Sequence, residues 1–273
     1  MGDLDPEQRL LQAIRSAVGD RIAYVCFSGG IDSTVVLAGC VRAGVATVAL
    51  LGVSDSLPAA EREDAHRIAL ELGARVEEVR TNEMESEAYR ENSGDRCYHC
   101  KTALYETVQS LAEDRQESGV ILVGTQLDDL GDHRPGLRAA AERGVVAPLL
   151  DAGLDKAAVR SLARKWNLSN SEKPAAPCLA SRVPVGTAVT PERLAQIEAV
   201  EAFLRARGLW PARARWHGTI VRLELPPELF PLAVEEPLRS DLRRVCRKAG
   251  FTFVALDLAG LQSGSLSLPL LAS

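Results

Sequence analysis

Three of the six cysteines have a spacing that can hold a metal centre. Cys97 and Cys100 form a CxxC pair in the string RCYHCK, and Cys178 lies much further along, in a proline-rich segment. Two thiolates at this spacing can bind one metal centre, and a third can complete a three-point site. A [4Fe–4S] cluster on three cysteines leaves one iron open for a labile sulfide. A redox pair, or a structural zinc site completed by Cys178 and by His99 or another histidine, fits the same residues.

The string SGGIDS, which contains Ser28, Gly29, Gly30, Asp32 and Ser33, can bind phosphate. Its glycines allow a tight turn, and a following helix N-terminus would complete an anion site. The serine hydroxyls can donate to phosphate oxygens, and the aspartate can hold a Mg²⁺ that bridges them. No lysine follows the glycines, so the string is not a Walker A motif. It resembles the PP-loop, whose members cleave ATP between the α- and β-phosphates. A strand-to-helix turn without a ligand is the alternative.

A second loop, GTQLDDLGD, follows an apolar run and is expected at the ligand-binding edge of the same sheet. Gly124 can allow the adenine or ribose of ATP to approach the backbone. Asp129 or Asp132 can bind metal or order the loop. Solvated loop acids in Asx-turns explain each aspartate equally well.

Alternating apolar and amphipathic segments predict βαβ units around a parallel sheet with helices on both faces. Strands are predicted over 21–27, 45–52, 74–79, 120–123 and 145–149. Helices are predicted over 6–18, 33–42, 59–72 and 155–166, with another from Tyr98. The polar, acidic stretch 82–96 is predicted to be a loop or short helix. This region, 1–166, would be an ATP-binding domain of α/β class.

The rest of the chain predicts a small α+β domain over 190–273, after a linker and active-site loop at 167–189. Thr190 followed by Pro191 marks the start of a helix that runs to Arg207. Strands 212–216 and 220–225, helix 240–248 and strand 252–256 follow.

Composition narrows the class of protein. The chain has 273 residues, a net charge of −5 and a pI near 5.5, which argues against a nucleic-acid partner. Residues 1–7 lack the apolar core of a signal peptide, and no apolar run reaches the length that spans a bilayer. We therefore expect a cytoplasmic protein with reduced thiols and no membrane partner. The remaining cysteines, Cys26, Cys40 and Cys246, are expected to be small buried apolar residues.

Three strings together resemble the LarE family of PP-loop (adenine nucleotide α-hydrolase-like) pyridinium sulfur transferases, which help to build the nickel-pincer nucleotide cofactor. They are SGGIDS from Ser28, RCYHCK from Arg96 and KPAAPCLASRVPVG from Lys173. The similarity continues through GDHRPGLRAA, RARWHGTIVRLEL and LDLAGLQSGS, and so covers nearly the whole chain. The resemblance implies that ATP and Mg²⁺ adenylate a pyridinium carboxylate mononucleotide, which then becomes a thiocarboxylate.

The family has two branches, which differ in their source of sulfur. One sacrifices the sulfur of a single cysteine, and the other holds a [4Fe–4S] cluster on three cysteines that carries an added sulfide. This chain has the cysteines of the second branch, Cys97, Cys100 and Cys178. Pro177 occupies the position of the sacrificial thiol, so the resemblance implies a cluster reloaded by sulfide or another sulfur donor.

The resemblance also implies roles for residues near Cys178. With Cys178 and Asp32, Arg182 would act at the catalytic centre, where it would steady the adenylate phosphate. Arg213 and Arg215 alternate on a predicted strand, so both face one side and can hold the phosphate of the substrate. Glu201 matches a site position of the family. A solvated strand face is the alternative for the two arginines. The family resemblance further implies a homo-oligomer, with a domain over 190–273 that binds substrate and contributes to oligomerisation.

Other functions use parts of this pattern. A PP-loop tRNA thiolase also combines an ATP loop with three cysteines, but the acidic balance argues against it. Amide-forming enzymes of NAD or GMP synthesis need an ammonia source and have no use for a CxxC pair. A nucleotide-sensing protein without turnover would release no pyrophosphate from ATP.

Overall fold

The structure is a computed structural model, and it describes residues 4–131 and 135–261. These residues form two compact units. The first contains the described parts of Met1–Ser54, Ala59–Ser86 and Asp95–Ala176, and the second contains Asp55–Pro58, Glu87–Gly94 and the described part of Pro177–Ser273. The predicted linker, 167–189, is thus divided between the units after Ala176.

The first unit is built on a sheet of four parallel strands in the order β3-β2-β1-β4. The strands are β1 (Ile22–Cys26), β2 (Thr47–Val53), β3 (Val76–Arg80) and β4 (Gly119–Leu122). Because strand side chains alternate between faces, β1 presents Tyr24 and Cys26 to one side and Ala23 and Val25 to the other. All four are buried, as in a sheet that is covered on both faces.

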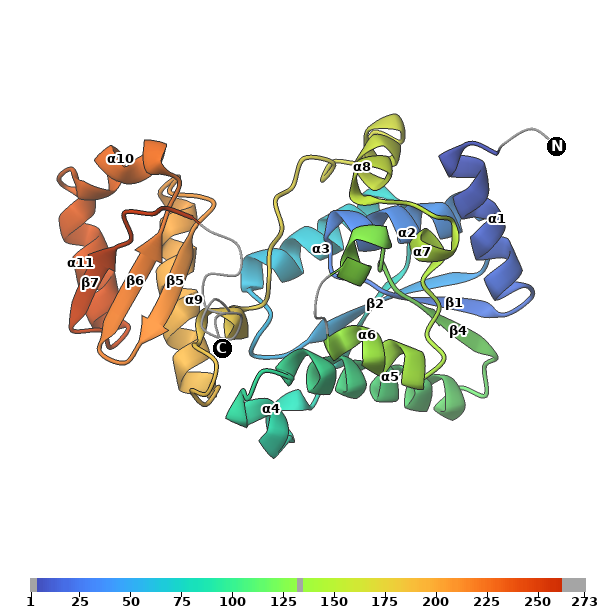
Figure 1. The fold of residues 1–273 in the computed structure, drawn as a ribbon, viewed down its shortest axis with the longest axis horizontal. Helices are drawn as coiled ribbons and strands as arrows, with labels where there is room; N and C mark the ends of the chain where they lie inside the picture. Colours follow the sequence, from blue (N-terminus) through green and yellow to red (C-terminus); the bar gives the residue numbers. More distant parts are fainter. Residues whose placement is uncertain (1–3, 132–134, 262–273) are drawn as a thin grey trace. The chain divides into compact units, whose positions relative to one another are not determined.

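Helices cover both faces of this sheet (Figure 1). One layer contains α5 (Arg96–Asp114) and α6 (Pro135–Glu142). Tyr105 and Val108 of α5 and Ala139 of α6 belong to one apolar core. The other layer contains α1 (Pro6–Val18), α2 (Ile31–Ala43), α3 (Ala59–Glu71), α7 (Pro148–Asp151) and α8 (Lys156–Lys165). The predicted α/β architecture is therefore confirmed.

One predicted strand of this unit was wrong. Residues 145–149 contribute only a single bridge between Val146 and Leu122, and the chain then enters α7. Pro148 occupies the start of that short helix. Proline lacks the N–H that a sheet requires, and its fixed φ suits the first turn of a helix.

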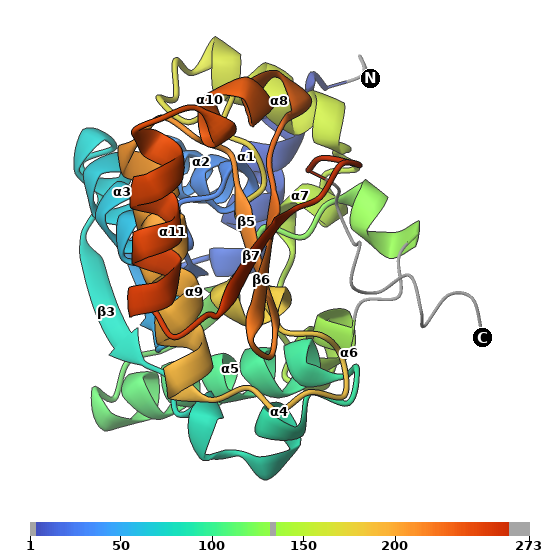
Figure 2. The ribbon, with the colours of Figure 1, turned by 90° about the vertical axis from the view of Figure 1, so that its left-hand side faces the viewer.

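The second unit contains a three-stranded sheet in the order β5-β6-β7. β5 (Arg213–His217) is antiparallel to β6 (Ile220–Glu224), which is parallel to β7 (Phe253–Leu256). Helices α9 (Pro191–Ala206) and α11 (Leu238–Lys248) lie together beside this sheet (Figure 2). The short helix α10 (Phe230–Val234) precedes α11. These elements confirm the predicted small α+β fold.

The acidic stretch 82–96, which is predicted to be a loop or a short helix, contains both. Residues Glu83–Glu85 form a 3-10 turn, and Glu87–Glu91 form the short helix α4. Residues Glu87–Gly94 belong to the second unit, where the buried Asn92 donates to the carbonyls of Pro184 and Thr187. This segment therefore holds the loop that follows Cys178.

Among the described helices, none has the length and apolar character needed to cross a bilayer.

Candidate functional site

The predicted phosphate loop joins β1 to α2. Gly29 has a φ of 68°, which only glycine adopts without strain, and Gly30 is the N-cap of α2. No side chain caps this helix N-terminus, so the backbone N–H groups of the first turn point into the loop. Ser33 Oγ accepts from the N–H of Ser28 at 3.2 Å and lies 3.2 Å from Ser28 Oγ. The loop thus combines N–H groups, two hydroxyls and a helix N-terminus, as an anion site requires.

Two glycines allow close backbone contacts at this loop, Gly29 within the loop and Gly124 in the segment after β4. A Cβ on Gly29 would lie 3.0 Å from Ala65 Cα of α3, and a Cβ on Gly124 would lie 2.7 Å from the Ser33 nitrogen. At Gly124 the next atoms are the Asp32 carbonyl carbon at 2.8 Å and Cβ at 3.0 Å. Gly124 was predicted to let a nucleotide approach, and its nearest neighbour here is the phosphate loop itself. A role in nucleotide binding stays a prediction.

Asn170 also fixes the loop, and the sequence analysis missed it. Its Nδ2 donates to the Gly29 carbonyl at 3.0 Å and to Thr34 Oγ1 at 2.8 Å, and the residue is 4% exposed. In a planar trans peptide the carbonyl and the following N–H point in opposite directions. Asn170 therefore sets the direction in which the Gly30 N–H faces. A buried asparagine far from the glycines in sequence leaves no periodic signal that could have revealed it.

The loop after β4 is ordered by its own aspartates. Asp129, 9% exposed, accepts from the backbone N–H of Gln126 at 3.1 Å, and Asp128 accepts from the N–H of Lys156 at the start of α8. Asp132, the other candidate of this loop, lies outside the described residues. Ordering the loop is one of the two roles predicted for Asp129, and metal binding stays a prediction.

The cysteines of the predicted cluster lie in both units. Cys97 is exposed and Cys100 is half-buried, and both lie near the start of α5 in the first unit. Residues three apart in a helix share one face, so the two thiols are neighbours. Cys178, half-buried, belongs to the second unit and precedes the 3-10 turn Leu179–Arg182. Within the described residues, no group of three or more His, Cys, Asp and Glu side chains is gathered as a metal site.

The other three cysteines are buried as expected. Cys26 ends β1, Cys40 lies in α2 and Cys246 lies in α11. Burial raises the pKa of Cys26 to about 11 and the pKa values of Cys40 and Cys246 to about 12. They remain neutral thiols near pH 7 and are poor nucleophiles and metal ligands.

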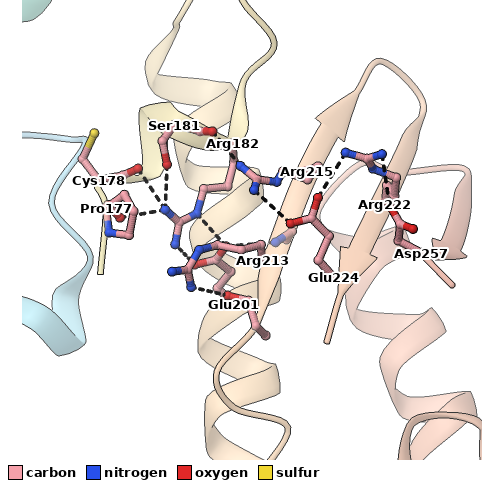
Figure 3. A network of polar contacts seen from close by, with 12 residues as sticks. Pro177, Cys178, Ser181, Arg182, Glu201, Arg213, Arg215, Arg222, Glu224 and Asp257 are labelled. Atoms are coloured by element: carbon pink, nitrogen blue, oxygen red, sulfur yellow. Dashed lines mark hydrogen bonds and ion pairs between the residues drawn. The ribbon is translucent and has the colours of Figure 1, made fainter. Parts of the chain in front are cut away.

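The second unit contains a buried cluster of arginines and glutamates (Figure 3). Its members come from the 3-10 turn, α9, β5 and β6, and they are between 1% and 9% exposed: Arg182, Glu201, Arg213, Arg215 and Glu224. The alternation along β5 brings Arg213 and Arg215 to one face, as predicted. These residues are buried, so a solvated strand face does not describe them.

Each glutamate of this cluster pairs with an arginine. Arg182 Nε and Nη2 donate to Glu201 Oε1 and Oε2 at 2.8 and 2.9 Å. Arg215 Nη2 donates to Glu224 Oε2 at 2.9 Å. Glu224, which was not predicted, also accepts from Arg222 at 3.1 Å. The sequence offers little signal for Glu224, since an acidic residue on a strand usually faces solvent.

Among these five buried residues the arginines outnumber the glutamates. Arg182, Arg213 and Arg215 carry three positive charges, and Glu201 and Glu224 carry two negative ones. Burial, and then the charges of Arg182 and Arg215, lower the pKa of Arg213 to about 10. A phosphate would offset this excess charge and accept charge-assisted hydrogen bonds.

The predicted contact of Arg182 with an adenylate phosphate stays a prediction. In this structure the guanidinium serves the chain itself. Besides Glu201, its Nη1 donates to the carbonyls of Pro177 and Cys178 and to Ser181 Oγ, at 2.7, 3.1 and 2.8 Å.

The parallel sheet and the glycine-rich loop that joins β1 to α2 define an α/β protein of the PP-loop class. No protein-family model matches the chain. The pyridinium-3,5-bisthiocarboxylic acid mononucleotide synthase of Lactiplantibacillus plantarum is 34% identical over 245 residues, 89% of this chain and 88% of that protein. The chain therefore belongs to the LarE family.

Two further relatives are uncharacterized proteins. The one from Synechocystis sp. is 40% identical over 246 residues, 90% of this chain and 91% of that protein. The one from Methanocaldococcus jannaschii is 28% identical over 167 residues, 61% of this chain and 64% of that protein.

Proposed function

We propose that the protein is an ATP-dependent sulfur transferase that converts a carboxylate of a pyridinium mononucleotide into a thiocarboxylate for nickel-pincer cofactor synthesis. The observation that carries the proposal is the 34% identity, across 89% of the chain, to a pyridinium-3,5-bisthiocarboxylic acid mononucleotide synthase. The name of that relative implies the matching biscarboxylic acid mononucleotide as the starting compound. The acidic chain and its buried arginine cluster favour such a small anionic substrate over tRNA.

The phosphate loop would bind ATP during the first half of the reaction. A substrate carboxylate oxygen bonds to the α-phosphorus, the bond between the α-phosphorus and the bridging oxygen breaks, and pyrophosphate leaves. Ser28, Ser33 and the N–H groups that begin α2 would donate to the phosphate oxygens. Asp32, in the first turn of α2, would hold Mg²⁺ against them.

The arginines of β5 would bind the phosphate of the substrate during both halves of the reaction. Arg213 and Arg215 share one face of a strand, and the cluster around them has an excess of positive charge. In the second half a sulfide bonds to the acyl carbon, and AMP leaves with the shared electrons of the broken C–O bond. The contacts of Arg213 and Arg215 with the substrate phosphate would keep the same substrate molecule bound until that step.

We propose Cys97, Cys100 and Cys178 as the residues that would hold a [4Fe–4S] cluster. The chemistry of the donor set fits, because Cys97 and Cys100 share a helix face and thiolates are the usual ligands of such clusters. A bound cluster would supply the sulfide. The position of Pro177, where the sacrificial branch has its thiol, supports this source over loss of sulfur from a cysteine.

The test is an anaerobic incubation of the protein with ATP, Mg²⁺, sulfide and pyridinium-3,5-biscarboxylic acid mononucleotide. We expect pyrophosphate release and, by mass spectrometry, products in which sulfur replaces carboxylate oxygen. Asp32→Asn should abolish both while the protein stays folded, and Asp20→Asn, at an exposed position, should not. Pyrophosphate release from Asp32→Asn at the wild-type rate would contradict the role of Asp32. A wild-type protein that binds ATP without releasing pyrophosphate would instead be a nucleotide-binding protein.

A further inference from the structure

Arg182 is the largest of the fully buried side chains, yet it is a cation in a small unit. It ends the 3-10 turn Leu179–Arg182 and is 1% exposed. Its bidentate pair with Glu201 joins this turn to α9. Apolar residues of similar volume often stabilise a core as well as a buried ion pair does, so the pair calls for a reason beyond stability.

Two hydrogen bonds of Arg182 outside the pair reach the backbone carbonyls on either side of the Cys178 Cα atom. Its Nη1 donates to the Pro177 carbonyl at 2.7 Å and to the Cys178 carbonyl at 3.1 Å. The Cys178 carbonyl also accepts from the N–H of Ser181 at 3.0 Å. Figure 3 shows the Cys178 sulfur directed away from the guanidinium, on the side opposite the carbonyl that Arg182 holds. Fixing the carbonyls on both sides of Cys178 fixes the direction of its Cα–Cβ bond, from which the thiol extends.

The same pair connects Cys178 to the strand of the phosphate-binding arginines. Glu201 Oε1 also accepts from the backbone N–H of Ala214, which lies between Arg213 and Arg215 on β5, at 2.9 Å. Arg215 Nη1 in turn donates to the Ser181 carbonyl at 2.9 Å. Two separate hydrogen-bond paths therefore run between the Cys178 turn and β5, and the charged side chains in both paths are buried.

We propose that the buried Arg182–Glu201 pair is a positioning device that fixes the Cys178 thiol relative to the phosphate-binding face of β5. This inference deepens the proposed function, because it takes β5 as the place where the substrate phosphate binds. It assigns Arg182 a role through Cys178, and it assigns Glu201 the role of orienting Arg182. Removing the pair should leave the fold intact and should leave the thiol without a fixed direction.

The test uses the double variant Arg182→Met/Glu201→Leu, which replaces both charged members of the pair with apolar groups. Arg182→Met alone would leave the buried Glu201 carboxylate without its arginine and is expected to destabilise the unit. The double variant removes both charges and is therefore expected to stay folded. Arg239→Met is the matched control, because Arg239 pairs with Glu236 in an exposed part of the same unit. Thermal unfolding of all variants would be compared with the wild type.

The readout is the rate at which iodoacetamide alkylates Cys178 in the metal-free protein without substrate, followed by peptide mass spectrometry. We expect the double variant to change this rate by about fivefold or more, because the reactivity of a thiol follows its access and surroundings. Cys97 in the first unit should react at the wild-type rate in every variant, and Arg239→Met should leave both rates unchanged. A folded double variant with a wild-type rate at Cys178 would overturn the inference.

A second readout separates this inference from the proposed function. In the sulfur-transfer assay the double variant should lower kcat by a larger factor than it raises the KM for the pyridinium mononucleotide, because Arg213 and Arg215 remain. An unchanged kcat in the folded double variant would also overturn the positioning role. A wild-type protein without sulfur-transfer activity would refute the proposed function, and the alkylation result would still decide whether the pair positions the thiol.

Discussion

Arg213 is a buried cation on β5. The residue is 9% exposed, and its pKa falls to about 10 because burial and two neighbouring arginines disfavour its charge. The pKa still lies far above neutrality, so the side chain stays charged at pH 7. A charged group in such a place gains from an anionic ligand more than an exposed arginine does, because little water screens the interaction.

Arg213→Met should therefore weaken the binding of pyridinium-3,5-biscarboxylic acid mononucleotide. The loss of a buried charge-assisted contact costs about 1.5–3 kcal/mol, which is roughly a tenfold to hundredfold increase in Kd. Calorimetry would measure this Kd, with ATP affinity as the internal reference and Arg239→Met as the control variant. An unchanged Kd for the mononucleotide would place the phosphate site elsewhere.

The roles of single residues could be predicted from the sequence only in part. Burial of Cys26, Cys40 and Cys246 followed from their apolar neighbours along the chain, and the shared face of Arg213 and Arg215 followed from strand alternation. Partners that lie far apart in sequence could not be derived. The pairing of Arg182 with Glu201 depends on how a 3-10 turn meets α9, which no periodicity encodes.

At the scale of elements, the phosphate loop depends on a segment well beyond the motif itself. Asn170 follows α8 and is followed by Lys173, whose ammonium lies 2.7 Å from Glu61 and 3.0 Å from Asp64 on α3. Both side chains fasten the segment that leads toward Cys178 to the phosphate-loop unit. The geometry of the loop is thus set by tertiary contacts as well as by its glycines.

Asn170→Ala should destabilise this unit and weaken the binding of ATP. The variant removes two buried hydrogen bonds and leaves the Gly29 carbonyl without its donor, which costs about 1–3 kcal/mol of unfolding free energy. Urea denaturation would measure the stability, and calorimetry with ATP would measure the affinity. Ser171→Ala, a neighbouring position, is the control. Unchanged stability and ATP affinity would show that the loop does not need this tether.

Most elements could be predicted because their signals are local. The helix over 6–18 has its predicted bounds, and the helix that starts at Pro191 ends within one residue of its predicted end. The prediction of a strand over 145–149 was wrong because an apolar run of that length suits a strand or a buried turn equally. Pro148 starts a short helix there instead. The membership of Glu87–Gly94 in the second unit depends on the buried contacts of Asn92, which only the folded chain reveals.

At the scale of the whole molecule, the sequence identified the family through three strings far apart in the chain. Each string alone is compatible with several functions, and the relative from Lactiplantibacillus plantarum, 34% identical over 89% of this chain, shows the family. The strings fall in both structural units, since SGGIDS and RCYHCK lie in the first and Cys178 lies in the second. The cysteines proposed to supply the sulfur therefore come from both units.

The source of the transferred sulfur can be tested through the iron that the protein binds. Protein purified without oxygen and reconstituted with iron and sulfide should bind close to four irons per chain, as a [4Fe–4S] cluster requires. Cys97→Ser, Cys100→Ser and Cys178→Ser should each lose most of this iron and its visible absorption, because each removes one of three ligands. Cys246→Ala is the control, since a buried thiol with a pKa of about 12 is no ligand at neutral pH. Zinc in place of iron would indicate a structural site. Wild-type activity of Cys97→Ser, with dehydroalanine at position 178 after one turnover, would show instead that Cys178 gives up its own sulfur.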